Sequence, residues 1–178
     1  MVARPKNRTM ATVLKFRMLT DENDNFIRDF EVPADISLLE LHNFIVSALG
    51  YDDCMASFFT ADDRWERVRE FTLMDMGDAG DDAPLPMGEV LVGHAIRRIH
   101  DRLIWLFDMF ANRAYYLEVL DAVQTEAGRK YPRVSFEHAA APDQYDPELN
   151  DDDTGSIFEE MMGDYSDFEG DDNYDDEY

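Results

Sequence analysis

The sequence predicts an α+β domain, in which a mixed, mainly antiparallel sheet of about five to six strands packs on one long helix and one short helix, with an acidic C-terminal tail. Three observations predict this class. Two segments near the N-terminus alternate with the period of a strand, a capped amphipathic helix follows them, and later apolar segments are separated by short polar turns. The chain of 178 residues, 45% of them apolar, is long enough for one ordinary domain.

The first two predicted strands form a hairpin. In the segment 12–20 every second residue is apolar, as at Phe16 and Met18, and charged residues stand between them, which is typical of a half-buried strand. Five polar turn residues follow, and the segment 26–32 has strand composition. Because proline has no backbone N–H, we expect Pro33 to end the second strand.

A helix over about Ser37–Leu49 is the clearest expectation. Ser37 and Glu40 have the spacing of a capping box, in which each side chain accepts a hydrogen bond from the other residue's backbone N–H. Gly50 follows where a left-handed cap is needed. The apolar residues that recur at helical spacing are Leu38, Leu41, Ile45, Ala48 and Leu49.

The second half of the chain is less clear. Residues 55–60 and 65–71 are interpreted as two further strands, 75–86 as a loop and 89–98 as a short helix. The run 103–107 is continuously apolar. Periodicity alone therefore leaves both a buried strand and a buried helix open for it.

The charge is strongly uneven along the chain. Forty acidic residues against 16 basic residues give a net charge of −24, and the 36 residues from Asp143 onward hold 16 acids and no base. We therefore divide the chain into a basic arm (1–10), an α+β domain (11–147) and an acidic tail (148–178) that is expected to be disordered when free. Such a charge disfavours general binding of the whole chain to DNA or to an anionic membrane.

The expected compartment is the cytoplasm. The chain has one cysteine, Cys54, which cannot form an internal disulfide. It also has neither a secretory signal nor a run of 18 apolar residues.

Six blocks of sequence occur in a suggestive order. They are Glu31–Asp35, Leu38–His42, Leu49–Asp53, Asp101–Asp108, Tyr116–Val119 and Tyr131–Arg133. Together they resemble the Ri-plasmid ORF-three-like family (plasmid pRi ORF-3-like proteins) over about residues 12–147. The resemblance implies an α+β fold in which Leu103–Asp108 and Arg113–Leu120 are strands. The family is essentially uncharacterised, although some members are labelled transposon passengers or resolvase-like.

The chain departs from the family pattern at polar positions. Cys54–Ser57 replaces a His-x-His segment, Met109–Arg113 replaces F-G-D-G-W, and Val134–His138 replaces the cysteine and acids that can follow Y-P-R. A metal or catalytic role built on those groups is therefore not expected in this member.

Neither a cofactor nor a metal site is predicted. The four histidines, His42, His94, His100 and His138, lack zinc-site spacing. The loop Asn150–Ile157 has oxygen side chains where an EF-hand loop has them, but its twelfth position is Met161. Weak association of a divalent ion with the acidic loops remains an alternative. Cys54 follows two aspartates that would suppress a thiolate, so it is interpreted as a structural residue.

Two groups of arginines are candidates for binding an acidic group. They are Arg97, Arg98 and Arg102, and the strip Arg64, Arg67 and Arg69. Surface ion pairs with neighbouring carboxylates would explain them equally well.

The tail carries the functional hypothesis. Apolar residues recur in it at spacings of mostly three and four among acids, so an induced helix would have an apolar stripe beside a carboxylate face. The candidate partner-binding residues are Phe158, Glu159, Glu160, Met161, Asp164, Tyr165 and Phe168. We expect an uncharacterised, non-enzymatic binding domain whose tail engages a basic protein partner or imitates nucleic acid.

Three alternatives stay open. The tail could be merely solubilising, or it could dock on the arginines of its own domain. The chain could instead be an accessory protein of mobile-element DNA rearrangement, using Arg4, Lys6 and Arg8 of the basic arm together with the two groups of arginines. The sequence leaves the oligomeric state undecided.

Overall fold

The computed structural model describes residues 11–77 and 80–145. The chain divides into two units, Met1–Pro142 and Asp143–Tyr178, and every helix and strand named below lies in the first. Within the described ranges no helix is both long and apolar enough to cross a membrane.

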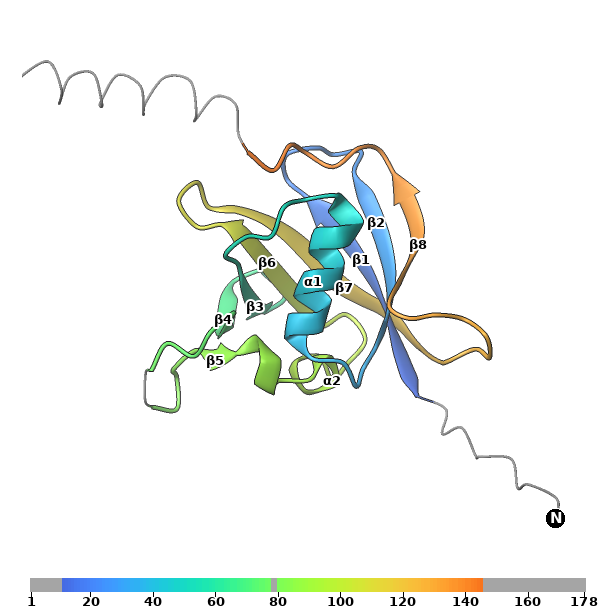
Figure 1. The fold of residues 1–178 in the computed structure, drawn as a ribbon, viewed down its shortest axis with the longest axis horizontal. Coiled ribbons are helices and arrows are strands. Elements are labelled where there is room, and N and C mark those ends of the chain that lie inside the picture. Colours follow the sequence, from blue (N-terminus) through green and yellow to red (C-terminus); the bar gives the residue numbers. More distant parts are fainter. Residues whose placement is uncertain (1–10, 78–79, 146–178) are drawn as a thin grey trace, which may run out of the picture. The chain divides into compact units, whose positions relative to one another are not determined.

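One eight-stranded sheet organises the first unit (Figure 1). The strand order is β5-β4-β3-β6-β7-β1-β2-β8. The strands are β1 (Thr12–Thr20), β2 (Ile27–Pro33), β3 (Ser57–Ala61), β4 (Arg67–Thr72), β5 (Leu85–Pro86), β6 (Arg102–Asp108), β7 (Arg113–Gln124) and β8 (Arg133–His138). All neighbours are antiparallel except β4 and β5, so the sheet is mixed.

The α+β class is confirmed, and the predicted number of strands is too low. The two additional strands, β5 and β8, are the outermost strands of the sheet. β5 has two residues, and the last four residues of β8 are exposed. Because an edge strand needs little buried surface, neither leaves a clear hydrophobic alternation in the sequence.

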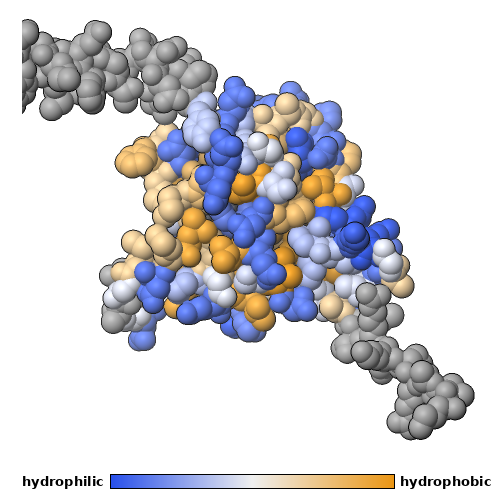
Figure 2. Space-filling model, viewed as in Figure 1, coloured by the Kyte–Doolittle hydropathy of each residue, from blue (hydrophilic) through white to orange (hydrophobic). Residues whose placement is uncertain are grey.

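Helix α1 (Leu38–Leu49) has the predicted caps. The Glu40 N–H donates to the Ser37 hydroxyl over 3.1 Å, and the Ser37 N–H donates to the Glu40 carboxylate over 2.8 Å. Gly50 has the left-handed φ of 68° that the C-terminal cap requires. In Figure 1, α1 lies in front of the sheet. Its outer side is polar, with Glu40, Asn43 and Ser47 exposed, and Figure 2 shows this as a hydrophilic stripe.

The predicted helix over 89–98 is wrong in length. The structure has a 3₁₀ turn, η1 (Met87–Glu89), and the four-residue helix α2 (Val92–Ala95). The backbone of this segment bonds to the start of α1 instead: the Leu38 N–H donates to Val90 over 2.9 Å, and the Val92 N–H donates to Ile36 over 2.8 Å. These bonds use groups that a longer helix would need for itself.

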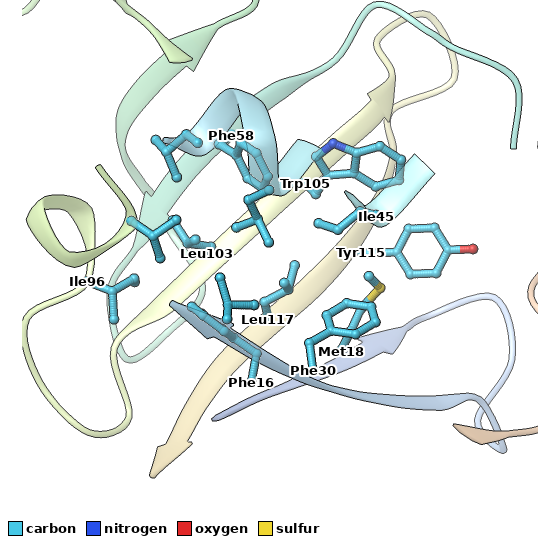
Figure 3. Packing of buried hydrophobic residues seen from close by; sticks show 14 of the residues in the cluster. Phe16, Met18, Phe30, Ile45, Phe58, Ile96, Leu103, Trp105, Tyr115 and Leu117 are labelled. Carbon is cyan, nitrogen blue, oxygen red and sulfur yellow. The ribbon is translucent and has the colours of Figure 1, made fainter. Parts of the chain in front are cut away.

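The main core lies between α1 and the sheet (Figure 3). Strand side chains and the helix residue Ile45 meet there, as do Met87, Val92 and Ile96 from the region of η1 and α2. The strand residues labelled in the view are Phe16, Met18, Phe30, Phe58, Leu103, Trp105, Tyr115 and Leu117.

β6 resolves the ambiguous run 103–107. Leu103, Trp105 and Phe107 point into the core under α1, whereas Ile104 and Leu106 belong to a second apolar cluster. The run is continuously apolar because β6 is buried on both faces. The strand that the family resemblance implied is confirmed.

Candidate functional site

The two faces of the sheet are covered differently. Every buried apolar residue of α1, η1 and α2 belongs to the cluster on one face. The second cluster, on the other face, contains strand and turn residues alone among those described: Ile104, Leu106 and Ala114, with the half-buried Phe59, Ala61, Trp65 and Tyr116 packed against them. We call this second side the open face.

Two rows of side chains run side by side across the strands of the open face. Each row follows residues whose Cα atoms pair between adjacent strands. The charged row runs from β4 to β8 through Arg67, Ala61, Arg102, Glu118, Arg17, Asp29 and Phe136. The apolar row runs from β3 to β1 through Phe59, Ile104, Tyr116 and Leu19. An apolar stripe therefore lies beside a charged stripe.

Trp65 folds back over these rows from the turn between β3 and β4. Its φ of 63° lies in the left-handed region, which is unusual for a bulky residue. The Trp65 N–H donates to the Asp62 carbonyl over 3.1 Å, and the Asp62 carboxylate accepts from the Arg64 and Glu66 N–H groups, each over 2.9 Å. These three bonds hold the turn in a conformation that costs free energy.

The indole of Trp65 lies between an arginine and a tyrosine. Its ring is edge-on to Tyr116, with 5.3 Å between centroids, and the Arg102 guanidinium lies 4.5 Å from its centroid. Arg102 also donates to the Asp63 carbonyl over 2.8 Å and lies 3.5 Å from the Glu118 carboxylate. Burial raises the pKa of Tyr116, so its phenol is neutral at ordinary pH.

Two further carboxylates, Asp29 in the charged row and Glu31 next to it, are also paired with cationic side chains. Arg17 donates to both oxygens of Asp29, each over 2.9 Å, and this hydrogen-bonded pair raises the pKa of Arg17. Glu31, beside the row on β2, hydrogen-bonds Arg133 and also lies within 4.0 Å of Lys15 and Arg129.

Arg67 differs from these arginines. Its guanidinium donates to the Asn112 side chain over 2.7 Å and lies 4.6 Å from the Phe59 ring centroid. It forms no ion pair with any residue that the structure describes. Its positive charge is therefore not neutralised by a direct partner on the open face.

The predicted arginine strip is broken by the sheet. The register shifts between Thr60 and Ala61, so Arg69 pairs with Thr60 and Arg67 with Ala61. Successive residues of β3 face opposite sides. Arg67 therefore lies on the open face and Arg69 on the other. Of the six candidate arginines only Arg102 has an ion pair among the described residues.

Two hollows lie along the charged row. The β6 hollow, of about 330 Å³, is lined by Ala61 and Arg102 of the row and also by Asp62, Asp63, Arg98, Ile99, His100 and Asp101. The β1 hollow, of about 340 Å³, is lined by Arg17, Asp29 and Phe136 of the row and also by Lys15, Glu31 and Leu120. Within the row, only Glu118 lies between the two sets.

A second candidate is the buried His42 on the other side of the sheet. The Trp105 indole donates to His42 Nδ1 over 3.1 Å, so the ring proton lies on Nε2. Nε2 is buried without a hydrogen-bond partner, 3.6 Å from an Asp53 carboxylate oxygen. Burial lowers the pKa of His42, and Asp53 opposes this effect only in part. No group of three potential metal ligands occurs among residues 11–77 and 80–145.

Several predicted site residues fall outside the described ranges. These are the tail residues Phe158, Glu159, Glu160, Met161, Asp164, Tyr165 and Phe168, the loop Asn150–Ile157, and Arg4, Lys6 and Arg8. Cys54 is half-buried and precedes β3 by three residues.

Sequence reasoning missed the open face. The continuous apolar run 103–107 was the sequence feature that could have indicated it, because a strand with apolar residues on both faces is buried on both faces. The left-handed turn that brings Trp65 onto β6 has no comparable signal, since Trp65 was interpreted as the start of a strand.

Comparison with known proteins gives a family and a fold. The family described as plasmid pRiA4b ORF-3-like protein matches residues 12–174. This range extends beyond residue 147, where the resemblance was expected to end. A crystal structure of a protein of unknown function from Methanosarcina mazei Go1 superimposes with a TM-score of 0.62 at 16% sequence identity, covering 96% of this chain and 94% of that one. No curated protein matches the chain. At this identity the crystal structure supports the fold alone.

Proposed function

We propose that this chain, which belongs to the plasmid pRiA4b ORF-3-like family, is a binding domain that recognises a protein partner through the open face of its sheet and performs no catalysis. The single cysteine favours the reducing cytoplasm as the place of action. The function follows from a surface, not from a constellation of reactive groups.

The conformation of Trp65 is the observation that carries the proposal. A bulky residue at a φ of 63° is retained only where its surroundings compensate for the strain, and such positions concentrate at functional sites. Here the strain places an indole beside Tyr116 and Arg102. Tryptophan, tyrosine and arginine are the residues that most often dominate the binding energy of protein interfaces.

The apolar row extends this central group. Leu19, at its end, is 42% exposed. Ile104 and Leu106 are buried beneath the aromatic side chains. A protein interface has an apolar core and a polar rim, and the apolar row beside the charged row has this arrangement.

The acidic tail supplies a second proposed contact, with a basic surface of the partner. Its support is the sequence alone. The proposed apolar anchors are Phe158, Met161, Tyr165 and Phe168, and the acids that steer association are Glu159, Glu160 and Asp164.

The test is capture of a partner from the native cytoplasm by four proteins: the wild type, Leu19→Glu, Ser47→Glu and a chain that ends at Asn150. Leu19→Glu places a charge in the apolar row, where we expect capture to be lost. Ser47→Glu adds the same charge to the exposed outer side of α1 and should capture normally. Comparing the first three proteins isolates the open face.

The shortened chain tests the tail. We expect it to unfold at nearly the wild-type temperature but to capture less partner at physiological salt, because charge steering is lost. Normal capture by Leu19→Glu would overturn the role of the open face. Unchanged capture by the shortened chain would remove only the tail from the proposal.

A further inference from the structure

We propose that the end of the sheet at which β3 begins is a second docking surface, which binds a basic amphipathic helix of a protein partner. This inference goes beyond the proposed function, because it concerns one end of the sheet and not its open face. Three observations support it: the place where exposed methionines gather, the fixed turn beside them and the carboxylates around them.

The strand register brings three segments to one end of the sheet. Ser57, the first residue of β3, pairs with Thr72, the last residue of β4, and with Leu106 near the end of β6. β3 lies between β4 and β6 in the sheet (Figure 1). The segment before β3, the segment after β4 and the turn after β6 therefore lie at the same end.

Exposed apolar side chains gather in these three segments. Met18 and Met87 are buried in the main core. The other four methionines that the structure describes are 49–60% exposed, and all four lie in these segments with the fully exposed Phe110. We call this group the methionine end: Met55, Met74, Met76, Met109 and Phe110.

Such a group favours a binding role. Single exposed apolar residues are common on protein surfaces, whereas a gathered group of them marks an interaction site. Methionine suits this role because its flexible, polarisable side chain adapts to the shape of a partner.

The turn after β6 holds Phe110 in place. Asp108 accepts hydrogen bonds from the Phe110 and Ala111 N–H groups, each over 3.1 Å. Asn112 has a left-handed φ of 54°, and its side chain accepts from Arg67 over 2.7 Å. Because the turn is already ordered, an exposed Phe110 loses little backbone freedom when it binds.

Carboxylates surround the methionine end. Asp75 and Asp108 accept hydrogen bonds from backbone N–H groups and form no ion pair with any residue that the structure describes. Of the arginines that reach the turn, Arg113 is paired with Glu22 over 2.9 Å, and Arg67 offsets one carboxylate. The carboxylates in or next to the three segments are Asp52, Asp53, Glu70, Asp75 and Asp108. Negative charge is therefore in excess here.

This charge selects the occupant. The chain's own tail is excluded, because the 36 residues from Asp143 onward hold 16 acids and no base. An anionic membrane is repelled in the same way. A basic segment gains from each carboxylate that it approaches.

The width of the surface fits a helix. The three segments belong to three neighbouring strands, which at about 4.8 Å per strand cover about 10 Å. An α-helix with its side chains has a diameter of about 10–12 Å. Its apolar face would lie on the methionine end, and its basic residues would face the carboxylates.

The experiment measures fluorescence anisotropy with the full chain and a labelled 16-residue probe that has leucines at helical spacing and lysines elsewhere. We expect Phe110→Ser to weaken binding about tenfold, because an apolar contact is lost. Phe136→Ser, at an exposed phenylalanine on the edge strand β8, should change it less than about twofold. Thermal unfolding verifies that both variants fold.

A second pair of variants tests the charge. Asp75→Lys should weaken binding about threefold, and less in high salt. Asp35→Lys changes the net charge equally at an exposed position before α1, outside the three segments, and should have a smaller effect. Equal weakening within either pair of variants would overturn the inference.

Four controls complete the design: the same peptide with glutamate for lysine, the same peptide with serine for leucine, a peptide of residues 1–10, and phosphatidylcholine vesicles. Each should bind at least about tenfold more weakly than the basic probe. Equal affinity for the peptide 1–10 would make the occupant the basic arm of a second copy. Equal affinity for the vesicles would make it a lipid surface. Either result, equal affinity for another control, or no binding of the basic probe would overturn the inference.

The failure of this inference is distinguishable from the failure of the proposed function. Leu19→Glu tests the open face by capture of the native partner, whereas Phe110→Ser tests the methionine end with the basic probe. If the basic probe does not bind but Leu19→Glu loses the native partner, only the second surface is wrong.

Discussion

Consecutive tyrosines of β7 show how differently the two faces of the sheet use the same residue type. Tyr115 is fully buried, and its hydroxyl lies 2.5 Å from that of Tyr51, which donates to the Pro142 carbonyl over 2.5 Å. Tyr116 points to the open face, is half-buried and touches Trp65 edge-on. Burial raises the pKa of both phenols, and that of Tyr115 is raised further by its hydrogen bond to Tyr51.

The two tryptophans repeat the contrast. Trp105 lies under α1, and its indole N–H donates to His42 over 3.1 Å. Trp65 lies on the open face, where its indole N–H has no hydrogen-bond partner in the described part of the chain. The indole N–H of Trp105 is therefore satisfied within the protein, whereas that of Trp65 remains available. The first side is the closed core of the domain, and the second is the side on which the proposed binding depends.

The largest expected effect is a loss of stability that differs between variants of these two tryptophans. Trp105→Ala should lower the free energy of unfolding by about 3–5 kcal/mol, because it leaves a cavity in a closed core. Trp65→Ala should lower it by about 1–2 kcal/mol, since it loses partial burial and one cation–π contact. Urea unfolding of both variants measures the difference. Equal losses would show that the open face is as much a structural core as the covered face.

A pH-dependent effect should follow from His42. Burial lowers its pKa, so below about pH 6.5 the unfolded chain binds a proton that the folded protein does not. The wild type should therefore lose stability as the pH falls below that value, until the lowered pKa of the folded state is passed. His42→Gln keeps an acceptor for the Trp105 indole but does not titrate.

Urea unfolding between pH 8 and pH 5 measures this effect. The stability difference between the wild type and His42→Gln should stay constant above about pH 6.5 and shift against the wild type below it. His138→Gln, at an exposed position, is the control. A difference that does not change with pH would contradict the burial of a neutral His42.

A smaller effect concerns the helix that covers one face. Ser37→Ala removes the acceptor of the Glu40 N–H and should cost about 1 kcal/mol. Partner capture should not change, because the open face contains no residue of α1 among those described. Thermal unfolding and capture assays on the same preparation check both statements. Loss of capture without unfolding would place α1 in the binding surface.

The smallest effect concerns the charged row. The pair Arg17–Asp29 is half-exposed on its arginine side, so a double-mutant cycle with alanine should give a coupling of about 0.5–1 kcal/mol. The coupling should fall in high salt. A coupling energy well above this range would indicate that the charged row stabilises the fold and does not exchange its ion pairs for contacts with a partner.

Local patterns predicted the elements whose partners are nearby in sequence. The β1–β2 hairpin follows from alternation around a polar turn, and α1 follows from the box formed by Ser37 and Glu40 and from Gly50. The shortened α2 and the edge strands β5 and β8 were not predicted. Their hydrogen bonds join segments distant in sequence, such as Val92 to Ile36 and β8 to β2. A single-sequence pattern does not contain this pairing.

The sequence by itself determined that this is an α+β chain of strongly acidic character with one well-capped helix, because composition, periodicity and capping act within a few residues of each position. Only the tertiary structure decided which arginines share a face. The register shift at Thr60 separates Arg67 from Arg69, and the left-handed Trp65 joins the turn after β3 to β6 and β7. The candidate surface depends on this alignment of strands, which is set by backbone pairing across the whole sheet.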